Sequence, residues 1–306
     1  MNRPWIAEQT VEAPLARALI EAQFPELAPA RLRPFGSGWD NTAFLVNDAW
    51  VFRFPRKQLA VPFLEVESRV LPRLAPLLPL PIPRPQKLGV AAEGYPWPFA
   101  GYPLLPGRTA CVAALDEEQR LRAVEPVARF LAALHAIPTD EAIGLGALPD
   151  TLNRLDVAGR TPRIRQWLED LAGLGLVDAV EPFHGVLADA ACARPARRAT
   201  LVHGDLYARH LLVDEQARPC GVIDWGDLHM GDPAIDLALV CGFFPPSARA
   251  EFQRIYGAVE DDTWRLARFK TLLTSVAIVA YGHDTGDAAL LREGRTALRH
   301  LVAHSW

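Results

Sequence analysis

The most informative part of the chain is residues 201–214, which read LVHGDLYARHLLVD. A loop that runs into an apolar strand here carries an acid, Asp205, and an imidazole, His210, five positions later. Because an apolar strand of this kind is expected to be buried, both side chains can face one cavity. Asp205 and His210 are therefore the first candidate site residues.

A second acid follows at the end of the next apolar strand. Residues 221–223 read GVI and lead directly into Asp224, the first residue of the sequence DWGD. Two strand ends thus present carboxylates to the same place. Phosphoryl transfer requires an acid beside the acceptor hydroxyl and oxygen or nitrogen ligands for the magnesium that bridges the phosphate oxygens. Asp205 fits the first role and Asp224 fits the second.

The composition restricts the class of protein. The chain has 306 residues, of which 50% are hydrophobic and 22% charged, and this is the balance of a globular protein with a sizeable core. A formal net charge of -4 provides no basic footprint for nucleic acid. The four cysteines form no CxxC pair, so we expect free thiols in a reducing compartment. The sequence shows neither a signal peptide nor a run of about eighteen apolar residues, which predicts a cytoplasmic protein without a membrane span.

The first hundred residues are expected to contain most of the strands. Apolar patterns predict strands at 31–35, 42–47 and 50–54 and helices at 11–24 and 65–78. Asn47-Asp48 supplies the turn between the second and third strands, and Pro72 should kink the second helix or displace its start. The proline-rich run 79–85 must be extended.

The remainder of the chain has a helical character. Helices are expected at 117–137, from 162 onward, at 263–282 and at 287–304, with a strand hairpin at 211–213 and 220–224. Pro126 should kink the first of these helices, and Thr161 should cap the second with Pro162 in its first turn. The fold class predicted from the residues is α+β, with a strand-rich N-terminal lobe and a mainly helical C-terminal lobe.

Three motifs carry a resemblance to a known family. They are HGD at 203–205, IDWGD at 223–227 and a DPxxDLA segment at 232–238. With these motifs in the right order and spacing, the chain resembles the aminoglycoside phosphotransferase family, a branch of the protein-kinase-like fold that includes macrolide and other small-molecule kinases. Any one of the motifs alone would be better explained as a chance turn with capping acids.

The resemblance implies an arrangement and several roles. It implies a nucleotide-binding lobe at 1–100, a hinge at 101–107 and a helical lobe at 108–306 with the catalytic loop and substrate pocket. Asp205 would accept the proton of the acceptor hydroxyl, and Asp224 would bind Mg²⁺ together with His210, which stands where the wider fold usually has asparagine. His203 and Asp236 would orient the loop backbone and would not touch substrate.

Further residues are implied for the nucleotide phosphates. Gly36, Ser37 and Gly38 resemble the hairpin that covers the phosphates, although two glycines are also common in any tight hairpin. The chain has no GxxxxGK[ST] sequence, which excludes a P-loop. Arg53 stands where the family carries a lysine, and Glu67 is the matching acid that would hold it.

Two alternatives stay open for the nucleotide contacts. Lys57 could bind phosphate in place of Arg53. Tyr102 and Leu104 resemble the hinge residues nearest the nucleotide base, but they could equally be buried residues that pack the lobe junction.

The implied function is transfer of the γ-phosphate of ATP or GTP to a hydroxyl of a small molecule. An aminoglycoside is the first candidate acceptor, and a macrolide, homoserine or an amino alcohol are alternatives. Polyamine sugars would be held by acids of the C-terminal half, namely Asp227, Asp232, Glu251, Glu260, Asp261, Asp262, Asp284 and Asp287. The apolar stretch 241–246 favours a less cationic molecule. A pseudokinase that binds nucleotide without catalysis is the rival from another class.

Overall fold

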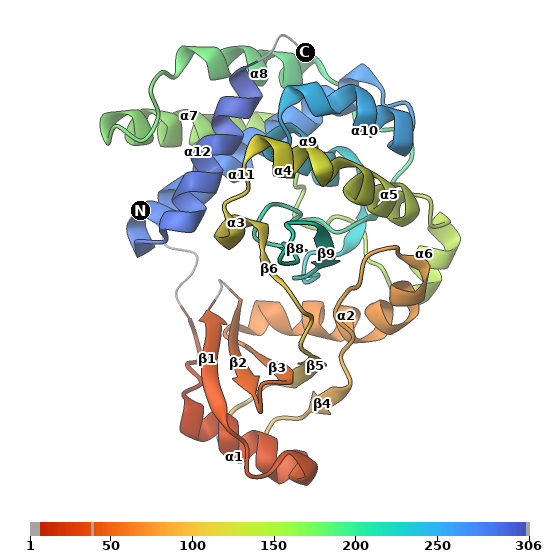
Figure 1. Cartoon of the computed structure of the whole chain (residues 1–306), viewed down its shortest axis with the longest axis vertical. Coiled ribbons are helices and arrows are strands. Elements are labelled where there is room, and N and C mark those ends of the chain that lie inside the picture. The colour runs from red at the N-terminus through yellow and green to blue at the C-terminus, as the bar shows by residue number, and fades with distance from the viewer. Residues whose placement is uncertain (1–6, 38–39, 304–306) are drawn as a thin grey trace. The chain divides into compact units, whose positions relative to one another are not determined.

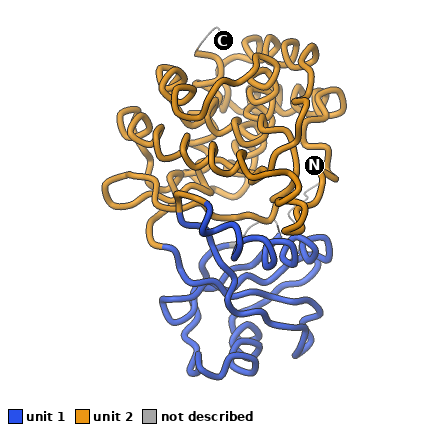
Figure 2. Tube along the Cα trace, turned by 90° about the vertical axis from the view of Figure 1, so that its right-hand side faces the viewer, with its two compact units in different colours: residues 1–77, 81–105 blue, residues 78–80, 106–306 orange. Residues whose placement is uncertain are grey.

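The computed structural model describes residues 7–37 and 40–303 and divides the chain into two units (Figure 2). Unit 1 comprises residues 1–77 and 81–105, and unit 2 comprises residues 78–80 and 106–306. The predicted boundaries at residues 100 and 107 lie on either side of the observed one, because residues 101–103 belong to a strand of unit 1. The α+β class, with a strand-rich first part and a mainly helical second part, is confirmed.

Unit 1 is built on an antiparallel sheet with the strand order β1-β2-β3-β5-β4 (Figure 1). The strands are β1 Leu32–Ser37, β2 Asn41–Val46, β3 Trp50–Pro55, β4 Lys87–Gly89 and β5 Phe99–Pro103. Asn47 and Asp48 both have positive φ, 52° and 55°, between β2 and β3. Consecutive left-handed residues are the mark of a tight hairpin turn, so the predicted turn is confirmed.

The two faces of this sheet are covered by different helices. Along β3, Phe52 and Phe54 are fully buried in a cluster with α1, Ala13–Gln23. Arg53 lies between them on the opposite face, since side chains alternate along a strand. That face receives α2, Val61–Leu74, whose Leu64 packs with residues of β5. Short 3-10 helices follow or precede these helices at Pro25–Leu27, Gln58–Ala60 and Ala75–Leu77.

Helix α2 begins and ends earlier than the predicted 65–78. Pro62 lies in its first turn, where the missing N–H costs nothing because that donor has no partner in a helix. Pro72 lies inside the helix, two residues before its end at Leu74. Pro72 therefore lies in the last turn of the helix and does not displace its start.

Unit 2 is mainly helical (Figure 1). Its helices are α3 Ala110–Ala113, α4 Glu117–Arg122, α5 Val124–His135, α6 Thr139–Leu145, α7 Val157–Gly173, α8 Glu181–Cys192, α9 Ala234–Phe243, α10 Arg249–Tyr256, α11 Asp261–Thr285 and α12 Ala288–Val302, with a 3-10 turn at Pro246–Ala248. Every residue of α9 is buried, and α11 and α12 pack against it. Within the described part of the chain, no helix is long and apolar enough to cross a membrane.

Two small sheets of unit 2 lie beside the helices and carry the motifs. The first has the order β6-β8-β9, with β6 Arg108–Thr109, β8 Leu211–Val213 and β9 Pro219–Val222. The second pairs β7 Thr200–Val202 with β10 His229–Gly231. The HGD loop connects β7 to β8, and the IDWGD segment connects β9 to β10.

Two predicted helix boundaries in unit 2 are corrected. The helix expected at 117–137 is interrupted at Ala123, because Pro126 has no N–H to bond the carbonyl of residue 122. Thr161 is not an N-cap. Helix α7 begins at Val157, where the Asp156 carboxylate accepts a hydrogen bond from the Gly159 N–H, and Pro162 lies inside the helix.

Candidate active site

The HGD loop is anchored by a carboxylate at the start of α9. Asp236 is fully buried, and its side chain accepts hydrogen bonds from the backbone N–H groups of His203, at 2.7 Å, and Gly204, at 2.9 Å. His135 Nε2 lies 3.2 Å from the same carboxylate, and its Nδ1 lies 2.7 Å from the Tyr256 hydroxyl. Because a carboxylate only accepts, Nε2 carries the proton and Nδ1 accepts from Tyr256.

These contacts also set the charge of Asp236. Burial alone would favour the neutral acid, but the hydrogen bond and charge of His135, together with the backbone donors, hold the pKa of Asp236 below its usual value. The group is therefore an anion at neutral pH, and its full charge is directed at the loop backbone. This is the orienting role that the resemblance implied for Asp236.

His203 joins the HGD loop to the segment that carries the second acid. Its Nε2 donates to the carbonyl oxygen of Ile223 at 3.0 Å, and its Nδ1 accepts from the Asp205 N–H at 3.3 Å. Burial lowers the pKa of His203, so the ring is neutral, as these two bonds require. The ring also lies 4.7 Å from the ring of Trp225, which is itself fully buried. The two acid-bearing segments are thereby fixed against each other.

Gly204 allows the same two segments to approach closely. Its φ is +92°, in the region that favours glycine, and a Cβ at this position would collide with the carbonyl oxygen of Asp227. The glycine of HGD is therefore required by the backbone of the WGD segment.

The side chains of the three predicted residues converge in unit 2. His210 Nδ1 lies 2.6 Å from the backbone carbonyl oxygen of Asp205, and its Nε2 lies 3.3 Å from the Asp224 carboxylate. A carbonyl only accepts, so Nδ1 holds the proton and the Nε2 lone pair of the neutral ring faces Asp224. Burial opposes protonation of the imidazole, but the charges of Asp224 and Asp205 outweigh it and raise the pKa of His210. The pair therefore favours a cation, either a proton or a metal ion.

This donor set fits magnesium held partly by phosphate. Among the residues that the structure describes, no group of three or more His, Cys, Asp or Glu side chains is arranged as a closed metal cage. Mg²⁺ is usually bound through one or two carboxylates, with phosphate oxygens and water supplying the other positions. Asp224, whose side chain is about half exposed at 48%, and the Nε2 of His210 can supply such a partial set. Asp224 has a φ of +66°, a conformation that aspartate tolerates better than most residues.

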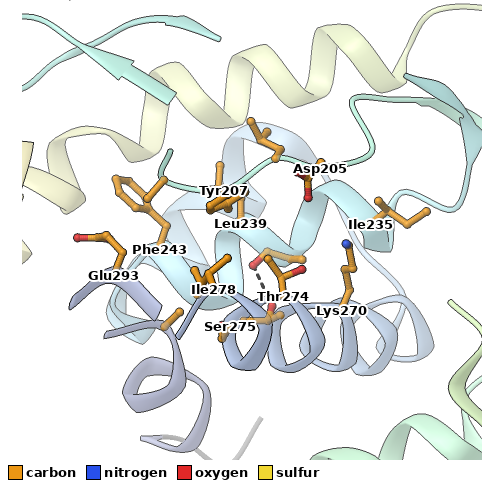
Figure 3. A pocket seen from close by; sticks show the side chains of 16 residues that line it. Asp205, Tyr207, Ile235, Leu239, Phe243, Lys270, Thr274, Ser275, Ile278 and Glu293 are labelled. Carbon is orange, nitrogen blue, oxygen red and sulfur yellow. Dashed lines mark hydrogen bonds between the residues drawn. The ribbon is translucent and has the colours of Figure 1, made fainter. Parts of the chain in front are cut away.

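Asp205 lines a pocket of unit 2. Its side chain is 35% exposed, and burial of its surroundings raises its pKa to about 6. The pocket is lined by the HGD loop, α9, α11 and α12, and Figure 3 shows the Asp205 carboxylate and the Lys270 ammonium directed toward each other. Lys270 also lies close enough for its charge to oppose the rise in the Asp205 pKa.

Several residues of the site have no signal in the sequence that would have revealed them. Arg154 forms ion pairs with both Asp227 and Asp150, and the second of these measures 2.7 Å. Lys270 belongs to a helix whose pattern indicates only which face is buried. His135, which carried no functional expectation, proves to be a partner of Asp236.

In unit 1, the predicted partner of Arg53 is found. The Nη1 atom of Arg53 lies 2.9 Å from one carboxylate oxygen of Glu67 and 3.2 Å from the other. Glu67 is almost fully buried on α2, so it fixes the guanidinium on this face of the sheet. The alternative cation, Lys57, lies instead 3.8 Å from the carboxylate of Asp40.

The positions of the other predicted nucleotide contacts do not decide whether these residues bind the nucleotide. Gly36 and Ser37 end β1, with open space beside Gly36, and Gly38 lies outside the described residues. Tyr102 is buried in β5, where it packs with Leu64 of α2. The N–H of Leu104 already donates to the carbonyl of Ala49 at 2.8 Å, so only the Leu104 carbonyl could bond a base. A role in nucleotide binding stays a prediction for all five residues.

Comparisons with known proteins agree on one family. The model of the phosphotransferase enzyme family matches residues 31–269. A curated aminoglycoside 3'-phosphotransferase of Streptomyces fradiae is 31% identical over 180 residues, which are 55% of this chain and 64% of that protein. The chain thus matches slightly less than two thirds of the length of this relative.

Solved structures extend the similarity over nearly the whole chain. The GDP complex of aminoglycoside 2'-phosphotransferase-IIIa is 25% identical, with a TM-score of 0.70, and covers 96% of this chain and 99% of its own. The GDP and kanamycin complex of APH(2")-IIia is 26% identical, with a TM-score of 0.68, over 94% of this chain and 98% of its own.

Proposed function

Since the chain belongs to the phosphotransferase enzyme family, we propose that it transfers the γ-phosphate of ATP or GTP to a hydroxyl group of a small molecule. The observation that carries the proposal is the convergence of Asp205, His210 and Asp224, which hydrogen bonds between the HGD and IDWGD segments hold together. The relatives with GDP bound support a nucleotide donor.

Asp205 is the proposed proton acceptor. In the transfer, the acceptor oxygen forms a bond to the γ-phosphorus while the bond from this phosphorus to the β,γ-bridging oxygen breaks. The electron pair of the broken bond leaves with the nucleoside diphosphate, and the hydroxyl proton passes to the Asp205 carboxylate. A pKa of about 6 makes this carboxylate a stronger base than an ordinary aspartate while leaving it mostly ionised at neutral pH.

Asp224 and His210 are the proposed metal ligands. When bound, Mg²⁺ would neutralise charge on the phosphate oxygens. The backbone carbonyl of Asp205 fixes the proton of His210 on Nδ1 and so keeps the Nε2 lone pair available on the side of Asp224. His203 and Asp236 act as positioning residues through the loop backbone.

Arg53 is the proposed phosphate ligand of unit 1. Its pairing with buried Glu67 limits the conformations of the guanidinium, and a planar guanidinium matches the geometry of phosphate oxygens. Gly36 and Ser37 would contribute backbone near the same phosphates. Because the donor is a nucleoside triphosphate, we place the reaction in the cytoplasm.

The replacement Asp205→Asn tests the proposal. A carboxamide cannot take up the hydroxyl proton, so turnover should fall by about 100-fold or more, with folding and nucleotide binding retained. Asp214→Asn makes the same chemical change at a turn carboxylate that pairs with Arg218, and it should leave turnover unchanged. The measurement is the release of nucleoside diphosphate in the presence of each member of a panel of hydroxylated antibiotics and metabolites. Turnover of Asp205→Asn within about threefold of the parent would contradict a proton-accepting role.

A further inference from the structure

The pocket beside Asp205 contains a cation, Lys270, whose charge acts on Asp205 without forming an ion pair. Lys270 projects from α11 into this pocket, and Figure 3 shows its ammonium directed toward the loop that carries Asp205. Within residues 7–37 and 40–303, Lys270 has no hydrogen bond and no carboxylate within ion-pair distance. A partly buried ammonium at a reaction site is costly to maintain unless a ligand compensates it.

Two carboxylates line the pocket, and neither is available to bind a cationic group of the acceptor. Glu293 lines the pocket but accepts two hydrogen bonds from Arg120, at 2.7 and 2.9 Å, and both side chains are only 4% exposed. Asp205 is reserved for the proton of the acceptor. A polycationic sugar would therefore find no uncommitted carboxylate in this pocket.

The acids that were expected to hold a polyamine sugar are also engaged. Asp227 pairs with Arg154, Glu251 with Arg254, Asp262 with Arg265, and Asp287 caps α12 while lying 3.5 Å from Arg209; Asp232 accepts from the N–H groups of Ala196 and Ala234. Binding a polycation through them would break contacts that the fold already makes. Five of the eight acids are therefore not available to bind the amino groups of such a sugar.

The remaining walls of the pocket are mostly apolar. Leu239 and Phe243 on α9 and Ile278 on α11 line it, and the hydroxyls of Thr274 and Ser275 lie along the same helix. A ligand that fills this pocket therefore places an apolar portion between α9 and α11, with Asp205 and Lys270 as the charged groups near it.

We propose that Lys270 determines acceptor specificity, and that the acceptor is a small hydroxylated molecule with an apolar body and a carboxylate group. The ammonium of Lys270 binds the carboxylate, and the hydroxyl lies at Asp205. This inference rests on the proposed transfer to a hydroxyl and narrows the class of its acceptor.

The test compares three six-carbon alcohols with an anionic, a neutral or a cationic group at the other end: 6-hydroxyhexanoate, 6-hydroxyhexanamide and 6-aminohexan-1-ol. Kanamycin is added as a polycation. The rate at which the full chain releases nucleoside diphosphate gives kcat/KM for each acceptor. We expect hydroxyhexanoate to be the best of the three. Lys270→Gln should lower kcat/KM for hydroxyhexanoate about tenfold, the size of one charge-assisted contact, and leave that for hydroxyhexanamide unchanged. Lys270→Glu should reverse the order in favour of aminohexanol.

The controls separate this inference from the proposed function. Arg265→Gln removes an exposed cation from the same helix and should change none of the rates. If aminohexanol or kanamycin is preferred and Lys270→Gln has no effect, the acceptor class is wrong while the kinase assignment stands. An increase in the nucleotide KM of Lys270→Gln with every acceptor would assign the lysine to phosphate and overturn the inference. If no acceptor stimulates release, the acceptor class fails, and if Asp205→Asn also leaves background hydrolysis unaltered, the proposed function fails with it.

Discussion

The replacement Asp236→Asn measures how strongly the buried carboxylate holds the HGD loop. The carboxylate accepts from the N–H groups of His203 and Gly204 and from His135. An asparagine keeps one acceptor oxygen and turns its NH₂ group toward at least one of these donors. A hydrogen bond to a charged group contributes about 1.5–3 kcal/mol, and a buried donor left without a partner costs about 1–3 kcal/mol. We therefore expect the free energy of unfolding to fall by about 3 kcal/mol at pH 7.

Urea unfolding followed by tryptophan fluorescence provides the measurement, since Trp225 is buried beside the same loop. Asp189→Asn is the matched control, because Asp189 is a half-exposed carboxylate 3.3 Å from Arg268 and should contribute less than about 1 kcal/mol. In folded Asp236→Asn protein, kcat should fall more than nucleotide affinity, because the change displaces the loop that carries Asp205. If Asp236→Asn lowered the free energy of unfolding no more than Asp189→Asn does, the buried carboxylate would not be what holds the loop.

The difference in free energy of unfolding between the parent protein and Asp236→Asn should also depend on pH, which provides a second check. The pKa of Asp236 is lower in the folded protein than the usual value of about 3.9 for an unfolded chain. Its stabilisation is therefore complete above that usual value and is lost as the pH falls through the folded pKa. The difference in stability between the parent protein and Asp236→Asn should shrink below about pH 4. A difference that stays constant on acidification would show that ionisation of this carboxylate is not the source.

Three further outcomes are expected. Turnover should decline as the pH falls below the Asp205 pKa of about 6, because only the carboxylate accepts a proton, and a rate that is flat across this region would exclude Asp205 as the base. Glu67→Gln should raise the nucleotide KM about tenfold, because Arg53 loses its ionic partner, and Arg53→Lys, which keeps the charge but loses the planar guanidinium, should raise it less. Equal KM values for the parent protein and both variants would show that Arg53 and Glu67 do not contribute to phosphate binding. Asp224→Ala should abolish magnesium-dependent nucleotide binding in calorimetry, whereas His210→Asn, with an amide oxygen suited to magnesium, should keep part of the activity; an asparagine variant as inactive as His210→Ala would assign the imidazole another role.

The local elements could be predicted because their causes are local. The alternation of apolar residues in β3 places Phe52 and Phe54 on one face and Arg53 on the other, and Asn47-Asp48 permits the tight turn that precedes this strand. Helix boundaries were predicted less well where two signals competed. A capping aspartate at Asp156 and a threonine-proline pair five residues later both resemble a helix start, and only the structure shows which of them is used.

The sequence by itself determined the α+β class and the three motifs that bring Asp205, His210 and Asp224 into one candidate site, since motif order and spacing follow the chain. The tertiary structure alone decided which distant residues complete it. His135 and Asp236 are 101 positions apart, and Arg120 and Glu293 are 173 apart. Helical periodicity predicts that a face is buried but not which element covers it. For this reason Lys270, one position in a long helix, became a candidate for binding the acceptor only once α11 was seen to line the pocket beside Asp205.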